Sequence, residues 1–195
     1  MVWSDTAHGG DEIAFLVGIY LFGAAVIFWI SRKPLRQVGS HGYYRCFAWQ
    51  GILGLFALHH PLFEPFAWSP WPGMAQVFML SSIAVVIAGW LELWRKGQAS
   101  DERNDQTLFP FERTTVLVET GIFRHIRHPM YASLALLAWG AYWQRPTWPG
   151  LGIASLTTLF LILTARADER ECRAYFGDAY VSYQAKTWAF IPWVF

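Results

Sequence analysis

A succession of long apolar runs constrains the fold of this chain more than any other feature. Three runs occupy the first half of the chain, and a pair of shorter runs follows in the second half; they cover residues 13–30, 46–62, 74–94, 130–143 and 149–165. A helix that crosses the hydrocarbon core of a bilayer needs about 20 predominantly apolar residues. The runs therefore predict an all-α integral membrane protein with about five transmembrane helices, of which the last two form a helical hairpin.

The composition agrees with a bilayer as the solvent. Hydrophobic residues make up 54% of the 195 residues and charged residues only 15%, whereas soluble domains carry roughly 25% charged residues. The net charge of +1 gives no basic footprint for nucleic acid. Cys46 and Cys172 have no metal-binding spacing and are expected as free thiols. We expect one membrane domain over residues 1–195, with no nucleic-acid partner and no metal site.

The positions of the basic residues predict the orientation. Every Lys and Arg except Arg145 falls after the first run, after the third run or in the C-terminal tail. Cytoplasmic loops carry the excess of Lys and Arg in membrane proteins. The N-terminus is therefore expected outside and the C-terminus in the cytoplasm, and a bacterial inner membrane is the expected location. The tail from Arg166 onward has the apolar spacing of a cytoplasmic amphipathic helix, which Gly177 would interrupt.

A polar segment precedes the fourth apolar run. It reads Gly121-Ile122-Phe123-Arg124-His125-Ile126-Arg127-His128-Pro129-Met130-Tyr131. Proline suits the first turn of a helix, so His128 is expected at the mouth of the following helix. The N-terminus of a helix has unpaired N–H groups and a partial positive charge, which attract carboxylate or phosphate. His128 and Tyr131 are therefore candidates to hold the anionic end of a small ligand.

A second charged cluster follows the fifth run and includes Arg166, Asp168 and Glu169. Because the two runs form a hairpin, both clusters are expected at the same membrane face. Asp168 and Glu169 would then face the cationic end of the ligand. Two simpler interpretations stay open: local ion pairs at a solvated helix end, and contact of Arg124 and Arg127 with anionic lipid headgroups.

These motifs resemble the isoprenylcysteine carboxyl methyltransferase family, and membrane phospholipid methyltransferases share much of the pattern. The resemblance covers roughly residues 114–192 and rests on three motifs: Arg127-His128-Pro129-Met130-Tyr131, the acidic pair Asp168-Glu169, and Phe176-Gly177. It implies an integral-membrane enzyme that uses S-adenosylmethionine without a Rossmann domain. Such an enzyme would methylate a lipophilic small molecule or lipid at the cytoplasmic face. Residues 1–96 would form the first three helices, and residues 107–195 the cofactor-binding catalytic part.

The resemblance also assigns site residues. It implies catalytic roles for Arg166 and Glu169. The cofactor contacts that it implies are Thr115, Val116, Leu117, Val118, Phe123, Arg127, His128, Pro129, Met130, Tyr131, Asp168 and Glu169.

Two departures from the family leave the methyl acceptor open. The carboxyl-methylating branch tends to have an arginine about one turn before its key glutamate, where this chain has Thr164. Asp168 stands where the family usually has glutamate. An amine, a thiol or a hydroxyl group is therefore as compatible with the sequence as a carboxylate.

A haem- or metal-binding membrane protein is the non-enzymatic alternative, since the histidines include His59, His60, His125 and His128. The first pair is expected near the outer interface and the second near the inner one, so one metal could not use both pairs. Gly150 and Gly152 are expected where helices pack closely, because small residues let membrane helices approach.

Overall fold

Six α-helices form the described part of the chain, which comprises residues 5–58, 72–98, 108 and 112–192 of a computed structural model. They are α1 (Asp5–Ile30), α2 (His41–Leu58), α3 (Pro72–Lys96), α4 (Pro129–Gln144), α5 (Trp148–Phe176) and α6 (Asp178–Gln184), with short 3-10 turns η1 (Pro34–Arg36) and η3 (Gly121–Arg124). These described residues contain no strand, and Ile126 and Trp188 form an isolated bridge. The all-helical prediction is thus confirmed there.

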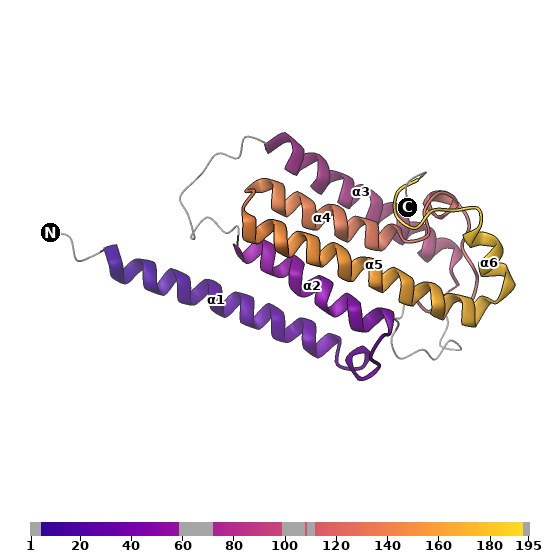
Figure 1. Ribbon diagram of the computed structural model, residues 1–195, viewed down its shortest axis with the longest axis horizontal. Helices are drawn as coiled ribbons and strands as arrows, with labels where there is room; N and C mark the ends of the chain where they lie inside the picture. The colour runs from indigo at the N-terminus through magenta and orange to yellow at the C-terminus, as the bar shows by residue number, and fades with distance from the viewer. Residues whose placement is uncertain (1–4, 59–71, 99–107, 109–111, 193–195) are drawn as a thin grey trace.

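The long helices α2 to α5 lie side by side, and α1 runs along the edge next to α2 (Figure 1). Within this bundle α2 packs mainly on α5, and α3 packs mainly on α4. Glycines permit both close approaches. A Cβ on Gly51 of α2 would lie 2.1 Å from Thr157 Oγ1 of α5, and one on Gly140 of α4 would lie 2.8 Å from Met79 Cγ of α3. The prediction for Gly152 is wrong, because a Cβ there would meet open space.

The ends of the α4–α5 hairpin follow from local sequence. Pro129 opens α4 directly after His128, as predicted. Thr147 caps α5 by accepting a hydrogen bond from the backbone N–H of Gly150 at 3.1 Å. At the other end, α5 stops at Gly177, whose φ of 60° suits glycine. The helix expected from Arg166 onward continues α5 as far as Phe176, and Gly177 interrupts it before the short α6, as predicted.

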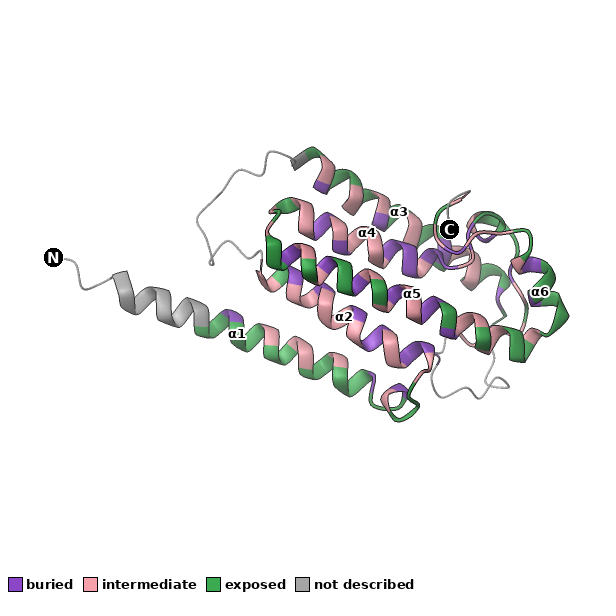
Figure 2. Ribbon diagram, viewed as in Figure 1, coloured by how far each residue is buried: buried purple, intermediate pink, exposed green. Residues whose placement is uncertain are grey.

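Exposed residues run along the outer faces of the helices (Figure 2), and many of them are large and apolar. Phe22 on α1 is 73% exposed and Trp94 on α3 is 71% exposed. Two helices, Gly73–Lys96 and Trp148–Phe176, are long and apolar enough to cross a bilayer, and Ala14–Ile30 is a shorter apolar helix. An apolar exterior over helices of this length indicates a membrane protein. The number of helices that cross the bilayer stays a prediction.

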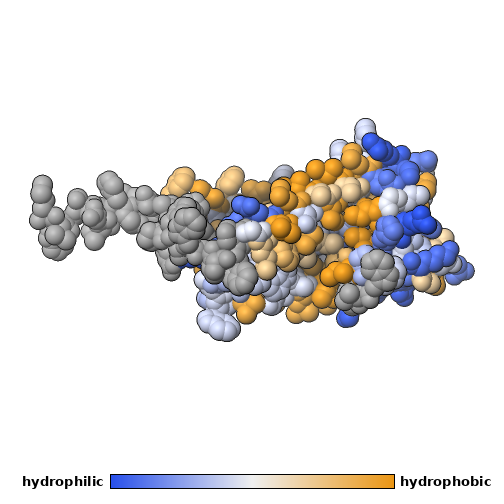
Figure 3. Space-filling view, turned by 90° about the horizontal axis from the view of Figure 1, so that it is seen from above, coloured by the Kyte–Doolittle hydropathy of each residue, from blue (hydrophilic) through white to orange (hydrophobic). Residues whose placement is uncertain are grey.

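Polar residues gather at one end of the molecule. In Figure 3 hydrophilic residues mark the end at which Figure 1 places α6, while hydrophobic residues cover the middle. The last residues of α1, α3 and α5 and the first residues of α2 and α4 meet at this end. The hairpin therefore brings its two charged clusters together, as the sequence predicted, with His128 Nε2 3.3 Å from Glu169 Oε1.

Candidate active site

The entrance to α4 is held by the C-terminal segment of the chain. The backbone N–H groups of Arg127 and His128 donate to the carbonyl oxygens of Trp188 and Ala189 at 2.8 and 3.1 Å. The side chain of Arg127 also donates to the carbonyl oxygen of Thr187. Since these bonds fix both backbone and side chain, the residues before Pro129 form a rigid rim.

Gly121 sets the path of the chain into this rim. Its φ is +58°, in the left-handed region, and a Cβ there would lie 2.7 Å from the carboxylate carbon of Glu92 on α3. Only glycine meets both requirements without strain. Glu92 itself binds Lys96 at 2.7 Å and accepts a hydrogen bond from Thr120 at 2.5 Å.

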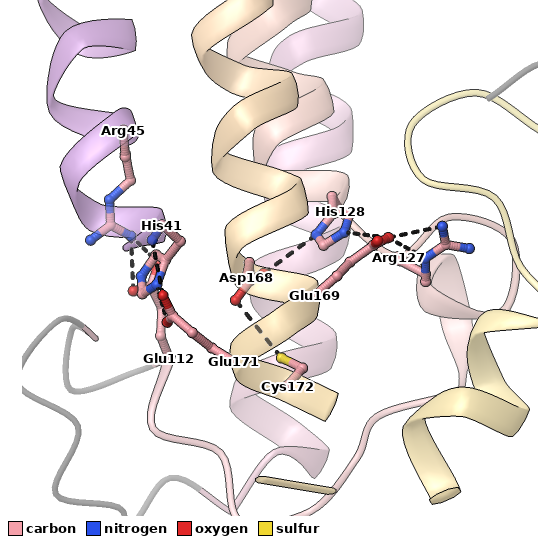
Figure 4. A network of polar contacts seen from close by, with 9 residues as sticks. All are labelled: His41, Arg45, Glu112, Arg127, His128, Asp168, Glu169, Glu171 and Cys172. Carbon is pink, nitrogen blue, oxygen red and sulfur yellow. Dashed lines mark hydrogen bonds and ion pairs between the residues drawn. The ribbon is translucent and has the colours of Figure 1, made fainter. Parts of the chain in front are cut away.

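Four ionisable residues, which we call the α4-side cluster, join this rim to the end of α5: Arg127, His128, Asp168 and Glu169 (Figure 4). His128 is buried, with Nδ1 3.4 Å from Asp168 Oδ2 and Nε2 3.3 Å from Glu169 Oε1. Arg127 Nε and Nη2 each lie 2.9 Å from the same Glu169 oxygen. Burial lowers the pKa of His128, but hydrogen bonds and charge from both carboxylates outweigh it and raise that pKa above its ordinary value.

A pocket of about 120 Å³ lies beside this cluster. Nine predicted cofactor residues line it: Leu117, Val118, Phe123, Arg127, His128, Pro129, Met130, Tyr131 and Asp168. The other lining residues are Leu93, Leu108, Glu112, Thr114, Cys172, Phe176, Tyr180 and Tyr183.

The remaining predicted site residues lie outside the pocket lining. Thr115 is turned toward the end of α3, where its hydroxyl donates to the carbonyl oxygen of Gln98 at 2.9 Å. Val116 and Arg166 are exposed. Glu169 does not line the pocket and binds Arg127 and His128 instead. The functional roles assigned to these four residues stay predictions.

A second group of ionisable residues lies on the other side of α5, and the sequence reading missed it. This α2-side cluster consists of His41, Arg45, Glu112 and Glu171 (Figure 4). Arg45 Nη1 donates to both oxygens of Glu112, at 2.7 and 2.9 Å. Glu171 accepts from the backbone N–H of His41 at 3.0 Å and lies 2.5 Å from its Nδ1. The signal available in the sequence was a histidine and an arginine one helical turn apart at the start of an apolar run.

An apolar cavity of about 430 Å³ lies further along the hairpin. It is lined by Phe78, Ala132, Ala135, Leu136, Trp139, Thr158, Leu161, Ile162, Phe190 and Ile191. The ring of Phe190 is 6.0 Å from that of His128, centroid to centroid. Phe190 therefore stands at the boundary between this cavity and the polar pocket.

The haem- or metal-binding alternative finds no support in the part of the chain that the structure describes. There, no group of three or more His, Cys, Asp or Glu side chains could hold a metal ion. His59 and His60 lie outside the described residues. His125 is exposed, whereas His128 is buried between two carboxylates.

Comparison with known proteins relates the chain to one class of enzyme, the methyltransferases. It is 22% identical over 191 residues to methanethiol S-methyltransferase of Crocosphaera subtropica, a match that covers 74% of this chain and 73% of that protein. It is 28% identical over 74 residues to methanethiol S-methyltransferase 1 of Bradyrhizobium diazoefficiens, which covers 37% of this chain and 25% of the relative. No protein-family profile and no solved structure matches the chain.

Proposed function

We propose that this protein is an S-adenosylmethionine-dependent methyltransferase of the membrane and that its acceptor is a small thiol. The observation that carries the proposal is the pocket between the N-terminus of α4 and the acidic end of α5. The thiol is suggested by the methanethiol S-methyltransferases to which the chain is similar.

The residues of the pocket fit the three charged groups of this cofactor. Its carboxylate suits the first turn of α4, where the N–H groups of Met130 and Tyr131 have no partner within the helix. Its ammonium suits Asp168, the residue of the acidic pair that lines the pocket. Its sulfonium suits the rings of Phe123, Tyr180 and other aromatic residues of the lining, because a cation is attracted to an aromatic face.

The chain contributes mainly by positioning. When bound, the cofactor supplies an activated methyl group, and the acceptor sulfur forms a bond to that carbon as the bond from the carbon to the donor sulfur breaks. Holding the two reactants in line is worth roughly 7–11 kcal/mol of the barrier. The thiol proton passes to a carboxylate oxygen, for which we assign Asp168. A thiol already contacts this group, since Cys172 Sγ lies 3.8 Å from Asp168 Oδ1.

The apolar cavity favours a second candidate acceptor. A lipophilic, isoprenylcysteine-like or lipid acceptor would place its apolar part there, next to Phe190 and within reach of the polar pocket. In this version the acceptor enters from the bilayer.

The proposal includes the topology expected from the sequence. Five helices cross a bacterial inner membrane, with the N-terminus outside and the C-terminus in the cytoplasm. The polar end with the pocket then faces the cytoplasm, where the cofactor is dissolved, and membrane lipids surround α1 and α3. The exposed apolar side chains of these two helices support this arrangement.

The test uses the full chain purified in detergent. We expect S-adenosylmethionine to bind, as measured by calorimetry, and label from a methyl-labelled donor to appear in methanethiol or ethanethiol. A lipid extract, analysed by mass spectrometry, tests the second candidate. Asp168→Asn is expected to lose activity, while Asp178→Asn, an exposed control on α6, is expected to retain it. A folded protein that binds no cofactor would rule out the proposal.

A further inference from the structure

Arg45 is a buried cation immediately behind the wall of the polar pocket. Only 4% of the residue is exposed, and its guanidinium carbon lies 5.2 Å from the centre of the Trp49 ring. A guanidinium in such surroundings is a strong site for a carboxylate, because its planar donors match the two oxygens and little water competes.

Glu112 already occupies this site from within the chain. Both of its oxygens lie within 2.9 Å of Arg45 Nη1. Glu112 also lines the polar pocket, whereas Arg45 does not. The carboxylate of Glu112 therefore stands between the guanidinium and any ligand in the pocket.

We propose that Glu112 is an acceptor-specificity residue, which fills the anion site of Arg45 so that the pocket takes a neutral acceptor such as a thiol and rejects a carboxylate. This inference rests on the proposed function. An acceptor with a carboxylate would bring its charge next to Glu112 and Asp168, which both line the pocket. Like charges repel one another, and repulsion of the wrong ligand is a common basis of specificity.

The pair formed by His41 and Glu171 holds the start of α2 against α5. Glu171 on α5 binds both the backbone and the ring of His41 at the first turn of α2. Arg45 lies one turn further along the same helix, so the backbone that carries its side chain is held next to α5. Burial of Arg45 further restricts where its guanidinium can lie.

Glu112→Ala in the full-length protein tests the inference without needing the cofactor. Removal of the side chain opens the guanidinium to the pocket, and formate or acetate should then bind in its place. We expect formate to raise the melting temperature of Glu112→Ala by roughly 2–4 °C or more relative to the same concentration of chloride. The wild type should show no difference between the two salts.

Two further variants separate the anion site from general effects. Glu112→Gln keeps the space filled and should respond to formate much less than Glu112→Ala. The double variant Arg45→Met, Glu112→Ala lacks the guanidinium and should not respond at all. If Glu112→Ala unfolds on purification, the yield of folded protein purified in formate is compared with the yield in chloride. A higher yield in formate then takes the place of the rise in melting temperature. Equal behaviour in both salts overturns the inference.

An activity assay then connects the anion site to the acceptor. In Glu112→Ala, acetate should inhibit thiol methylation by competing with the thiol, and inhibition at least tenfold stronger than in the wild type is expected. If formate stabilises Glu112→Ala but acetate does not inhibit its thiol methylation, the role of Glu112 in acceptor specificity is overturned. A wild type that binds no cofactor would overturn the proposed function and with it the role in acceptor choice, whereas the melting measurements would still decide whether Glu112 fills an anion site of Arg45.

Discussion

The two clusters at the end of α5 have the same composition but different positions relative to the pocket. Each combines one histidine, one arginine and two carboxylates. The α4-side cluster contributes Arg127, His128 and Asp168 to the pocket lining, while the α2-side cluster contributes Glu112 alone and keeps its cations behind the wall. The comparison teaches that one acidic helix end can serve two tasks: ligand contact on one side and fixation of the neighbouring helix on the other.

The largest expected effect concerns stability on the α2 side. Arg45→Met leaves Glu112 without its buried cationic partner, and breaking such a pair costs about 3–5 kcal/mol. Thermal unfolding in detergent should show a large loss. Arg32→Met removes an exposed arginine that lies over Trp29, and it should cost less than about 1 kcal/mol. Adding Glu112→Leu to Arg45→Met should restore most of the stability, because an apolar pair needs no counter-ion.

The next effect concerns activity on the α4 side. Asp168→Asn keeps the shape of the side chain but removes its charge and its capacity to accept a proton. Loss of general-base catalysis costs about 10²- to 10⁴-fold in rate, so kcat/KM for the thiol should fall by that amount. Glu171→Gln on the other side should lower the melting temperature and leave the dissociation constant of the cofactor nearly unchanged. Equal effects of both variants on cofactor binding would remove the distinction between the clusters.

A third effect concerns pH, and both clusters should show it. Burial lowers the pKa of His41, but hydrogen bonding to Glu171 and the charge of Asp168 outweigh this, and the pKa is raised as it is for His128. A raised folded-state pKa contributes stability that is complete below the ordinary value of about 6.5 and is lost as the pH rises through the raised value. The melting temperature should therefore fall as the pH rises above about 6.5.

Single variants assign this pH effect to its cluster. His41→Asn and His128→Asn should each remove part of the decline, and the double variant should remove most of it. If the melting temperature of the double variant still falls with rising pH as in the wild type, groups other than these two histidines cause the fall.

The smallest effect is expected at Arg166, for which the family resemblance implied a catalytic role. Its side chain is exposed and does not line the pocket. Exposed substitutions usually change stability by less than about 0.5 kcal/mol. Arg166→Gln should also change the cofactor dissociation constant by less than about threefold, measured by calorimetry. A loss of methyl transfer as large as that of Asp168→Asn would instead support the role that the resemblance implied.

The two clusters also differ in how well the sequence alone predicts them. The α4-side cluster is encoded locally: Pro129 fixes the start of a helix, and a hairpin of two apolar runs returns the chain to Asp168. The first feature is local and the second needs only that two consecutive helices form a hairpin, and the structure places both as expected. Most of the predicted pocket lining followed from the same motif.

The α2-side cluster could not be predicted in this way. Arg45 on α2 and Glu112 in the segment between α3 and η3 are far apart in the sequence, so their pairing depends on a tertiary contact between these two segments. In the sequence Arg45 looked like one of many cytoplasmic charges. The apolar run ends at residue 165, but α5 continues to Phe176, and along this extension Glu169 pairs with Arg127 and Glu171 with His41.

The bonds from Arg127 and His128 to Trp188 and Ala189 have a consequence for the order of assembly. Residues 187–190 leave the ribosome after α1 to α5 have been synthesised. The rim at the mouth of α4 is therefore completed only when the tail has folded back onto the helices. Until then the nascent chain has the helical scaffold but not the completed rim.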